Sequence, residues 1–188
     1  TLGRIGEFGN LRVCVIGDLI VDEYIDCEPL GMSQEDPTVV VTPVDTRRFL
    51  GGAGIVAAHA AGLGADVQYL GVTGSDEVGA YAREELDRLG VNLRLVVDET
   101  RPTTLKQRFR ADGNTLLRVS HLHRGVIAQR SQEELLERFS AVAPDSDLVV
   151  FSDFNYGCLP QPLVEELTVI GSDHSLTMVA DSQSSSQV

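Results

Sequence analysis

Two carboxylates close to the end of an apolar run are the first residues of this sequence that suit ligand chemistry. Asp18 follows the apolar run of residues 13–17, and Asp22 comes four residues later. Such a run is typical of a central parallel strand, and ligands of open α/β sheets bind at the carboxyl ends of these strands. Carboxylates at that edge can accept hydrogen bonds from a polyol. A turn or helix-capping role explains Asp18 equally well, whereas ligand binding is the favoured interpretation of Asp22.

Three glycines, Gly51, Gly52 and Gly54, stand at the start of a run of small apolar residues. The run predicts a helix over 53–63 that packs closely on a sheet, and glycine is unfavourable inside a helix. We therefore expect the Gly51-Gly52 pair to form a turn at the helix start, where free N–H groups and missing Cβ atoms let ligand oxygens approach the main chain. A tight turn that serves packing alone is the alternative.

Strand and helix patterns alternate around these residues. After a first strand that ends at Gly17, helices are expected at 53–63, 77–89, 131–141 and 160–171, and strands at 66–71, 92–97, 147–152 and 175–180. This alternation is characteristic of βαβ units. It predicts an α/β fold with three layers, built on a mostly parallel, Rossmann-type sheet.

Two β-rich stretches interrupt this alternation, near 24–48 and near 103–120. The first contains "EYIDCEPL" and "PTVVVTPVDTRRF", and the second contains "TTLKQRFR" and "TLLRVSHL" around the turn "ADGN". These four strands do not fit easily into a parallel sheet. We expect them to form a small separate sheet, set as a lid over one edge of the main sheet, with a small-molecule pocket between the two layers.

Composition excludes several classes of function. The chain has 188 residues and a formal net charge of -13, which argues against nucleic acid as a partner because phosphate backbones require clustered Lys and Arg. No apolar run approaches the roughly 18 residues of a membrane span, and the first residues lack a signal-peptide pattern. We therefore expect no membrane association and a cytoplasmic location.

Common cofactor and catalytic motifs are missing. The sequence has no GxGxxG after the first strand, no GxxxxGK[ST], no GxSxG and no HExxH. The three cysteines have no metal-binding spacing, and His121 and His123 could share a strand face but lack a third ligand. We expect no bound metal among the residues of this chain.

The ordered motifs resemble those of the ribokinase-like (PfkB) family of sugar kinases, and specifically its heptose-phosphate kinase branch. The resemblance spans residues 13 to about 181, and these stretches carry it: "VIGDLIVDEY", "MSQEDPTVVV", "FLGGAGIVAAHAAGLGADVQYLGVTGSDEVG", "PTTLKQRFR", "LLRV" and "LVVFSDFNYGCL". The resemblance implies a ribokinase-like fold with a β-sheet lid. It also implies ATP-dependent phosphorylation of a sugar or sugar phosphate, with ATP and Mg²⁺ as cofactors.

The same resemblance assigns roles to individual residues. Asp22 and the Gly51-Gly52 turn would approach sugar hydroxyls, with Asp18 and Asp153 as further substrate-binding candidates. Lys106 and Arg108 would be directed toward a phosphorylated sugar, although a solvated strand face explains this pair equally well. The lid strands would exclude water from the reaction and would also form a homodimer interface.

Three departures from the branch keep other functions open. Ile55 stands where heptose kinases carry a sugar-binding asparagine, and Tyr156 and Gln183 each replace a lysine. These changes support the alternative of a degenerate kinase fold that acts as a non-catalytic sugar-binding or regulatory module. A nucleoside acceptor is a third hypothesis, in which Phe154 and Tyr156 stack on a base.

No catalytic base can be named in this sequence. In the family, a Gly-Ala-Gly-Asp motif supplies the base, and the resemblance places that motif beyond residue 188 with most of the ATP site. The strand expected at 175–180 runs into a polar stretch, whereas a parallel sheet normally continues with another helix. We therefore expect residues 1–188 to be the N-terminal part of one kinase domain and to be inactive by themselves.

Overall fold

A computed structural model describes residues 8–123 and 125–183. The helices are α2 (Gly52–Gly62), α3 (Glu77–Arg88), α4 (Gln129–Val142) and α5 (Gln161–Asp173), with short 3-10 turns η1 (Phe8–Asn10) and η2 (Ala143–Asp145). The strands are β1 (Arg12–Gly17), β2 (Leu19–Met32), β3 (Val39–Gly51), β4 (Asp66–Thr73), β5 (Asn92–Val97), β6 (Thr104–Ala111), β7 (Asn114–His121), β8 (Leu148–Asp153) and β9 (Thr177–Ser182). They form two sheets, which we call the body sheet and the lid.

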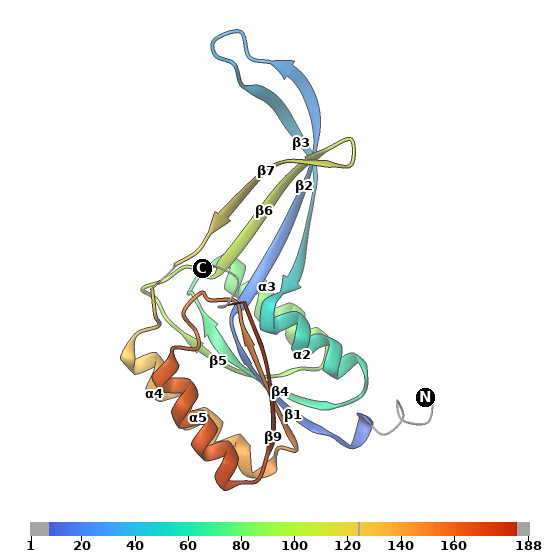
Figure 1. Ribbon diagram of the computed structural model, residues 1–188. Coiled ribbons are helices and arrows are strands. Elements are labelled where there is room, and N and C mark those ends of the chain that lie inside the picture. Colours follow the sequence, from blue (N-terminus) through green and yellow to red (C-terminus); the bar gives the residue numbers. More distant parts are fainter. Residues whose placement is uncertain (1–7, 124, 184–188) are drawn as a thin grey trace.

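The body is a three-layer α/β unit, as the alternating pattern predicts. Its sheet is parallel in the order β5-β4-β1-β8-β9, with α2 and α3 over one face and α4 and α5 over the other (Figure 1). Central strand β1 contributes to both hydrophobic layers: Val13 and Val15 pack with α2 and α3, and Cys14 and Ile16 pack with α4 and α5. This two-sided burial explains why β1 is apolar at every interior position.

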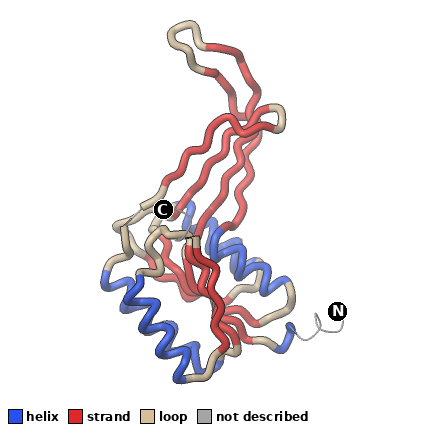
Figure 2. The backbone as a smooth tube through the Cα atoms, in the orientation of Figure 1, coloured by secondary structure: helices blue, strands red, loops and turns tan. Residues whose placement is uncertain are grey.

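The lid is a four-stranded sheet in the order β3-β2-β6-β7, and it projects from one end of the body (Figure 2). Its outer pairs are antiparallel hairpins, but the central pair, β2 and β6, is parallel. The β6–β7 turn falls at the predicted "ADGN", where Asp112 (φ 49°) and Gly113 (φ 79°) adopt left-handed conformations. A separate lid sheet is therefore confirmed.

Some boundaries differ from the prediction. The lid begins at Leu19, five residues before the expected start near 24, because β2 follows β1 with only Asp18 between them. Gly17 makes this tight connection possible, since a Cβ atom there would lie 1.9 Å from the carbonyl oxygen of Ser152. Helix α4 begins at Gln129 rather than 131, and α2 begins at Gly52 rather than 53. The last residues of the expected polar stretch, 184–188, lie outside the described part of the chain.

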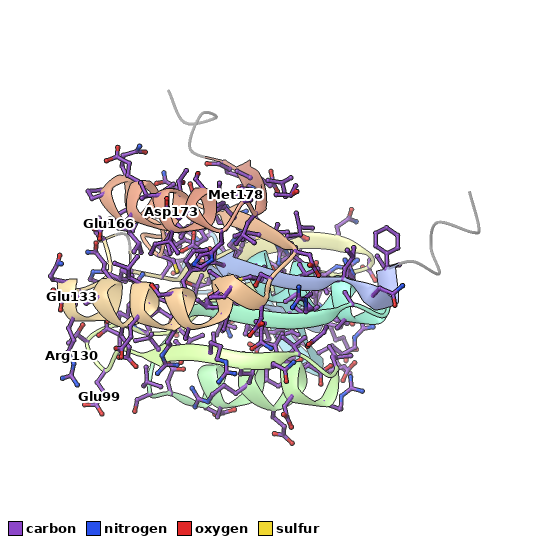
Figure 3. The ribbon with its side chains drawn as sticks, turned by 90° about the horizontal axis from the view of Figure 1, so that it is seen from below. Glu99, Arg130, Glu133, Glu166, Asp173 and Met178 are labelled. Atoms are coloured by element: carbon purple, nitrogen blue, oxygen red, sulfur yellow. The ribbon has the colours of Figure 1, made fainter. Side chains whose placement is uncertain are left out.

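Acidic side chains lie on the outer surfaces of α4 and α5. Glu133 of α4 and both Glu166 and Asp173 of α5 are exposed there (Figure 3). Within the described residues, no helix has the length and apolar character needed to cross a membrane.

Candidate functional site

The base of the lid meets the carboxyl end of β1, and the predicted glycine pair lies at this junction. Gly51 ends β3 and precedes α2, while Gly52 is its first residue with a φ of +56°. A Cβ atom on Gly51 would lie 2.4 Å from Oδ2 of Asp22, and one on Gly52 would lie 2.3 Å from the Asp18 carbonyl oxygen. The glycines therefore allow the main chain to approach Asp22 and the end of β1. This close packing explains both glycines, and their contact with a ligand stays a prediction.

Basic side chains line one face of β6. Lys106, Arg108 and Arg110 occupy alternate positions, so they project from the same face of the lid. Nη1 of Arg108 forms an ion pair with Oδ1 of Asp22, and this contact raises the pKa of Arg108. The ring centroid of Tyr24 lies 5.2 Å from the guanidinium carbon of Arg108 and 5.7 Å from that of Arg110. We call this group of five side chains the cationic face.

The cationic face borders an open cavity of about 470 Å³ at the base of the lid. Its lining includes Asp22, Tyr24, Phe49 and Arg110. The rings of Tyr24 and Phe49 meet edge to face, with centroids 5.7 Å apart. A hollow with carboxylate, cationic and aromatic walls can bind hydroxyl groups, an anionic group and an apolar ring face.

Lys106 extends from the lid toward the loop that follows β8. Its Nζ atom lies 5.0 Å from the ring centroid of Tyr156 and 5.8 Å from that of Phe154. Such distances are typical of cation–π contacts. The two aromatic residues therefore connect the body loop to the cationic face, and their rings lie beside an ammonium group.

Asp18 lies beneath the same loop rather than on the open surface. Its side chain is buried, and its carboxylate accepts N–H hydrogen bonds from Phe154 (2.8 Å), Tyr156 (3.2 Å) and Cys158 (3.1 Å). Burial raises the pKa of Asp18, and the three N–H donors oppose this rise. These contacts favour positioning of the loop as the role of Asp18, and its contact with substrate stays a prediction.

Asp153 starts this loop and points to its other side. Its carboxylate accepts hydrogen bonds from the Asn155 N–H (2.9 Å) and from the Ser182 hydroxyl (2.8 Å). A second cavity of about 350 Å³ is lined by Asp153, Met178 and Ser182 among others, and it borders α5 and β9. The structure thus brings Asp22, Lys106 and Arg108 to the cationic face and places Asp153 near β9.

The opposite face of the lid fixes its base to the body. Glu23 is 4% exposed and accepts hydrogen bonds from Arg48 Nε (2.6 Å) and from Gln107 Nε2 (2.6 Å). Arg48 also contacts Glu77 of α3 at 2.8 Å, and its carbonyl oxygen accepts a hydrogen bond from Tyr81. Burial alone would raise the pKa of Glu23, but the bonds from Gln107 and Arg48 outweigh it and lower that pKa.

The three residues that depart from the expected sequence pattern, Ile55, Tyr156 and Gln183, occupy different environments. Ile55 is partly buried in the layer between α2 and the body sheet. Tyr156 lies under Lys106, and the backbone N–H of Gln183 donates to the carbonyl oxygen of Asp153. His121 bonds to Gln107, and residues 8–123 and 125–183 contain no group of three His, Cys, Asp or Glu side chains placed to hold a metal ion.

Sequence reasoning missed three residues that belong to this site. Tyr24 and Arg110 complete the cationic face, and Arg101 donates a hydrogen bond to the Tyr156 carbonyl oxygen at 2.7 Å. The alternation of Tyr24 with Asp22, and of Arg110 with Lys106 and Arg108, is a period-two signal that could have identified the first two. Arg101 carries no such signal, because its partner is 55 residues away.

Known proteins show the same fold and related sequences. Residues 10–188 match the family described as pfkB family carbohydrate kinase. The bifunctional protein HldE of Desulfatibacillum aliphaticivorans is 34% identical over 178 residues, which cover 94% of this chain and 36% of that protein. The D-beta-D-heptose 7-phosphate kinase of Bordetella bronchiseptica is 36% identical over 179 residues, covering 93% of this chain and 55% of that enzyme.

Solved structures agree at the level of fold. Phosphofructokinase-2 from Escherichia coli, in complex with substrates and products, superposes with a TM-score of 0.73 at 14% identity, covering 92% of this chain and 54% of that one. The chain spans about a third to a little over half the length of the two curated relatives. Because the family match covers nearly all of its residues, this chain belongs to the pfkB family of carbohydrate kinases.

Proposed function

We propose that this chain forms the acceptor-binding side and the lid of an ATP-dependent kinase that phosphorylates a sugar phosphate of the heptose-phosphate type. The observation that carries the proposal is the cationic face, which sets one carboxylate among three cations at the junction of lid and body. Asp22 would accept hydrogen bonds from acceptor hydroxyls, and the cations would bind the phosphate already present on the acceptor.

Excess positive charge on the β6–β7 hairpin supports a phosphorylated acceptor over a free sugar. Arg118 of β7 lies directly opposite Arg108 in the antiparallel register. Like charges in such a position destabilise a sheet, and Asp22 is the only carboxylate paired with Arg108 among the described residues. A bound phosphate would offset this repulsion.

ATP and Mg²⁺ enter the proposal through the family, and so does a cytoplasmic site of action. The described residues offer no cluster of metal-binding side chains and the sequence has no P-loop, so neither cofactor is assigned to residues of this chain. The kinase name of the Bordetella bronchiseptica relative and the carbohydrate kinase family match favour phosphoryl transfer over the non-catalytic binding module.

We also propose a homodimer that forms through the lid. More than half of the exposed large hydrophobic side chains in the described ranges belong to lid strands or their connection. They are Leu30, Met32, Val39, Val40, Val44, Phe49, Leu116 and Leu117. Exposed apolar side chains gathered on one sheet favour an interface between proteins.

Binding of a heptose phosphate, a hexose phosphate and the two free sugars, measured by calorimetry, tests the acceptor proposal. We expect the phosphorylated sugars to bind more tightly and R108M to remove most of that preference. R94M is the matched control, because Arg94 of the edge strand β5 bonds to Gln68 of β4 in the body sheet. Equal affinity for free and phosphorylated sugars would overturn the proposal. Turnover is tested by ADP release from Mg-ATP, with this chain and with a longer polypeptide that contains it.

A further inference from the structure

The loop after β8 is held in an unusual backbone conformation. Asn155 has a φ of +60° and Gly157 a φ of +90°, so left-handed residues flank Tyr156 on both sides. A Cβ atom on Gly157 would lie 2.2 Å from the carbonyl oxygen of Gly125. Such a conformation persists only where surrounding contacts hold it, so the groups that bind the Tyr156 peptide must supply these contacts.

Two side chains of opposite charge form hydrogen bonds with the backbone of Tyr156. The Asp18 carboxylate accepts the Tyr156 N–H at 3.2 Å, and Nη2 of Arg101 donates to the Tyr156 carbonyl oxygen at 2.7 Å. The same Arg101 nitrogen donates to the His123 carbonyl oxygen at 3.3 Å. Asp18 and Arg101 also line one small cavity with Cys158. Both polar backbone groups of Tyr156 are therefore fixed by the body.

The Tyr156 ring in turn holds Lys106. Lys106 forms no ion pair with any described residue, and its ammonium group lies over the rings of Tyr156 and Phe154. A lysine side chain has four flexible bonds and loses much rotamer freedom when it is held in one place. The aromatic pair restricts Lys106 before a ligand binds, which lowers the entropic cost of using its charge.

We propose that Arg101 is a positioning residue, which fixes the Tyr156 peptide so that the Tyr156 ring holds the Lys106 ammonium group at the cationic face. Only the use of the ammonium group, which is to bind phosphate, rests on the proposed function. The placement of Lys106 itself can be measured without any ligand.

The composition of the chain makes this placement directly observable. Lys106 is its only lysine, whereas arginine occurs 14 times. Selective isotope labelling of lysine therefore gives a single CεH₂ signal in an NMR spectrum. In the folded chain, we expect the ring currents of Tyr156 and Phe154 to displace this signal from its position in the urea-unfolded chain.

Four variants test the role of Arg101 in that signal. R101M and Y156L should remove most of the displacement, whereas Y156F, which keeps the ring and the backbone carbonyl, should retain it. R138M is the matched control, because Arg138 also donates to a backbone carbonyl oxygen, that of Leu95 at 2.8 Å, but on the α4 side of the body. A full displacement in R101M, or none in the wild-type chain, would overturn the proposal. If R101M does not fold, R101Q is judged by the same criteria.

Titration with inorganic phosphate separates this inference from the proposed function. We expect phosphate to shift the Lys106 signal and R101M to weaken the apparent affinity about threefold to tenfold, with R138M unchanged. Unchanged phosphate affinity in a folded R101M that has lost the displacement would overturn the claim that positioning aids binding. If phosphate leaves the wild-type signal unmoved while the variants behave as expected, the phosphate role fails and the positioning role stands.

Discussion

The body and the lid are stabilised in different ways. The body has two continuous hydrophobic layers, and its largest buried side chains, such as Tyr69 and Phe139, are fully inaccessible to solvent. The lid is covered on neither face over most of its length, and ion pairs, cation–π contacts and one aromatic pair connect its strands. Burial of apolar side chains therefore stabilises the body, whereas the lid exposes polar and apolar side chains to molecules outside the chain.

The largest expected effect comes from a cavity in the body. Leu135 of α4 is fully buried in the layer that contains Ile16 and Phe139. L135A should lower the free energy of unfolding by about 2–5 kcal/mol, the usual range for a buried leucine. Urea denaturation followed by circular dichroism measures this change. If L135A lost no more free energy of unfolding than a lid-surface variant, the body would not depend on burial more than the lid does.

A smaller loss is expected where the lid joins the body. R48M removes a donor from the nearly buried Glu23 and also breaks the contact with Glu77. Leaving a buried carboxylate short of a partner should cost about 1–3 kcal/mol of unfolding free energy at neutral pH. R47M is the control, since Arg47 pairs with the more exposed Asp26, and should have little effect.

The same variant should change the acid sensitivity of the chain. The folded-state pKa of Glu23 lies below its ordinary value of 4.5, so its stabilising contribution is present above that value and is lost as the pH falls through the folded-state pKa. Without Arg48, this loss should diminish. Denaturation midpoints measured between pH 7 and pH 3 provide the test, and an unchanged pH profile in R48M would contradict it.

An exposed ion pair between the first residue of β1 and the residue before β8 should contribute less to stability. Asp147 accepts hydrogen bonds from the backbone N–H and the guanidinium group of Arg12, and these bonds lower its pKa to about 2. D147N should therefore remove a modest stabilisation that the wild-type chain loses only as the pH falls from near 3.8 toward 2. The stability difference between the two proteins should be present at neutral pH and should vanish at the acid end of this range.

The smallest effect on folding is expected on the outer lid. Val44 is 69% exposed, so V44S should change the free energy of unfolding by less than about 0.5 kcal/mol. If the proposed homodimer forms through this surface, the same variant should reduce the dimer fraction measured by sedimentation. A large loss of monomer stability would show that the lid depends on burial as the body does.

Sequence patterns predict the body better than the site. The run Val13 to Ile16 identifies a buried strand because all four side chains are enclosed, and this signal is local. Asp18 could not be assigned in the same way, since its three hydrogen-bond donors lie 136 to 140 residues further along the chain. The period-two pattern of β6 marks the cationic side chains, but whether they face solvent or a body loop depends on the parallel pairing of β2 with β6, which no local pattern encodes.

That parallel pair also has a consequence for the order of folding. Residues 20–26 pair with residues 104–110, and the segments of the body from α2 to β5 lie between them in sequence. Closing so long a loop is entropically unfavourable until the intervening chain is compact. We expect the two lid hairpins to join late in folding, after the first half of the body has formed, so that a chain with a damaged body leaves two unpaired strand edges prone to association.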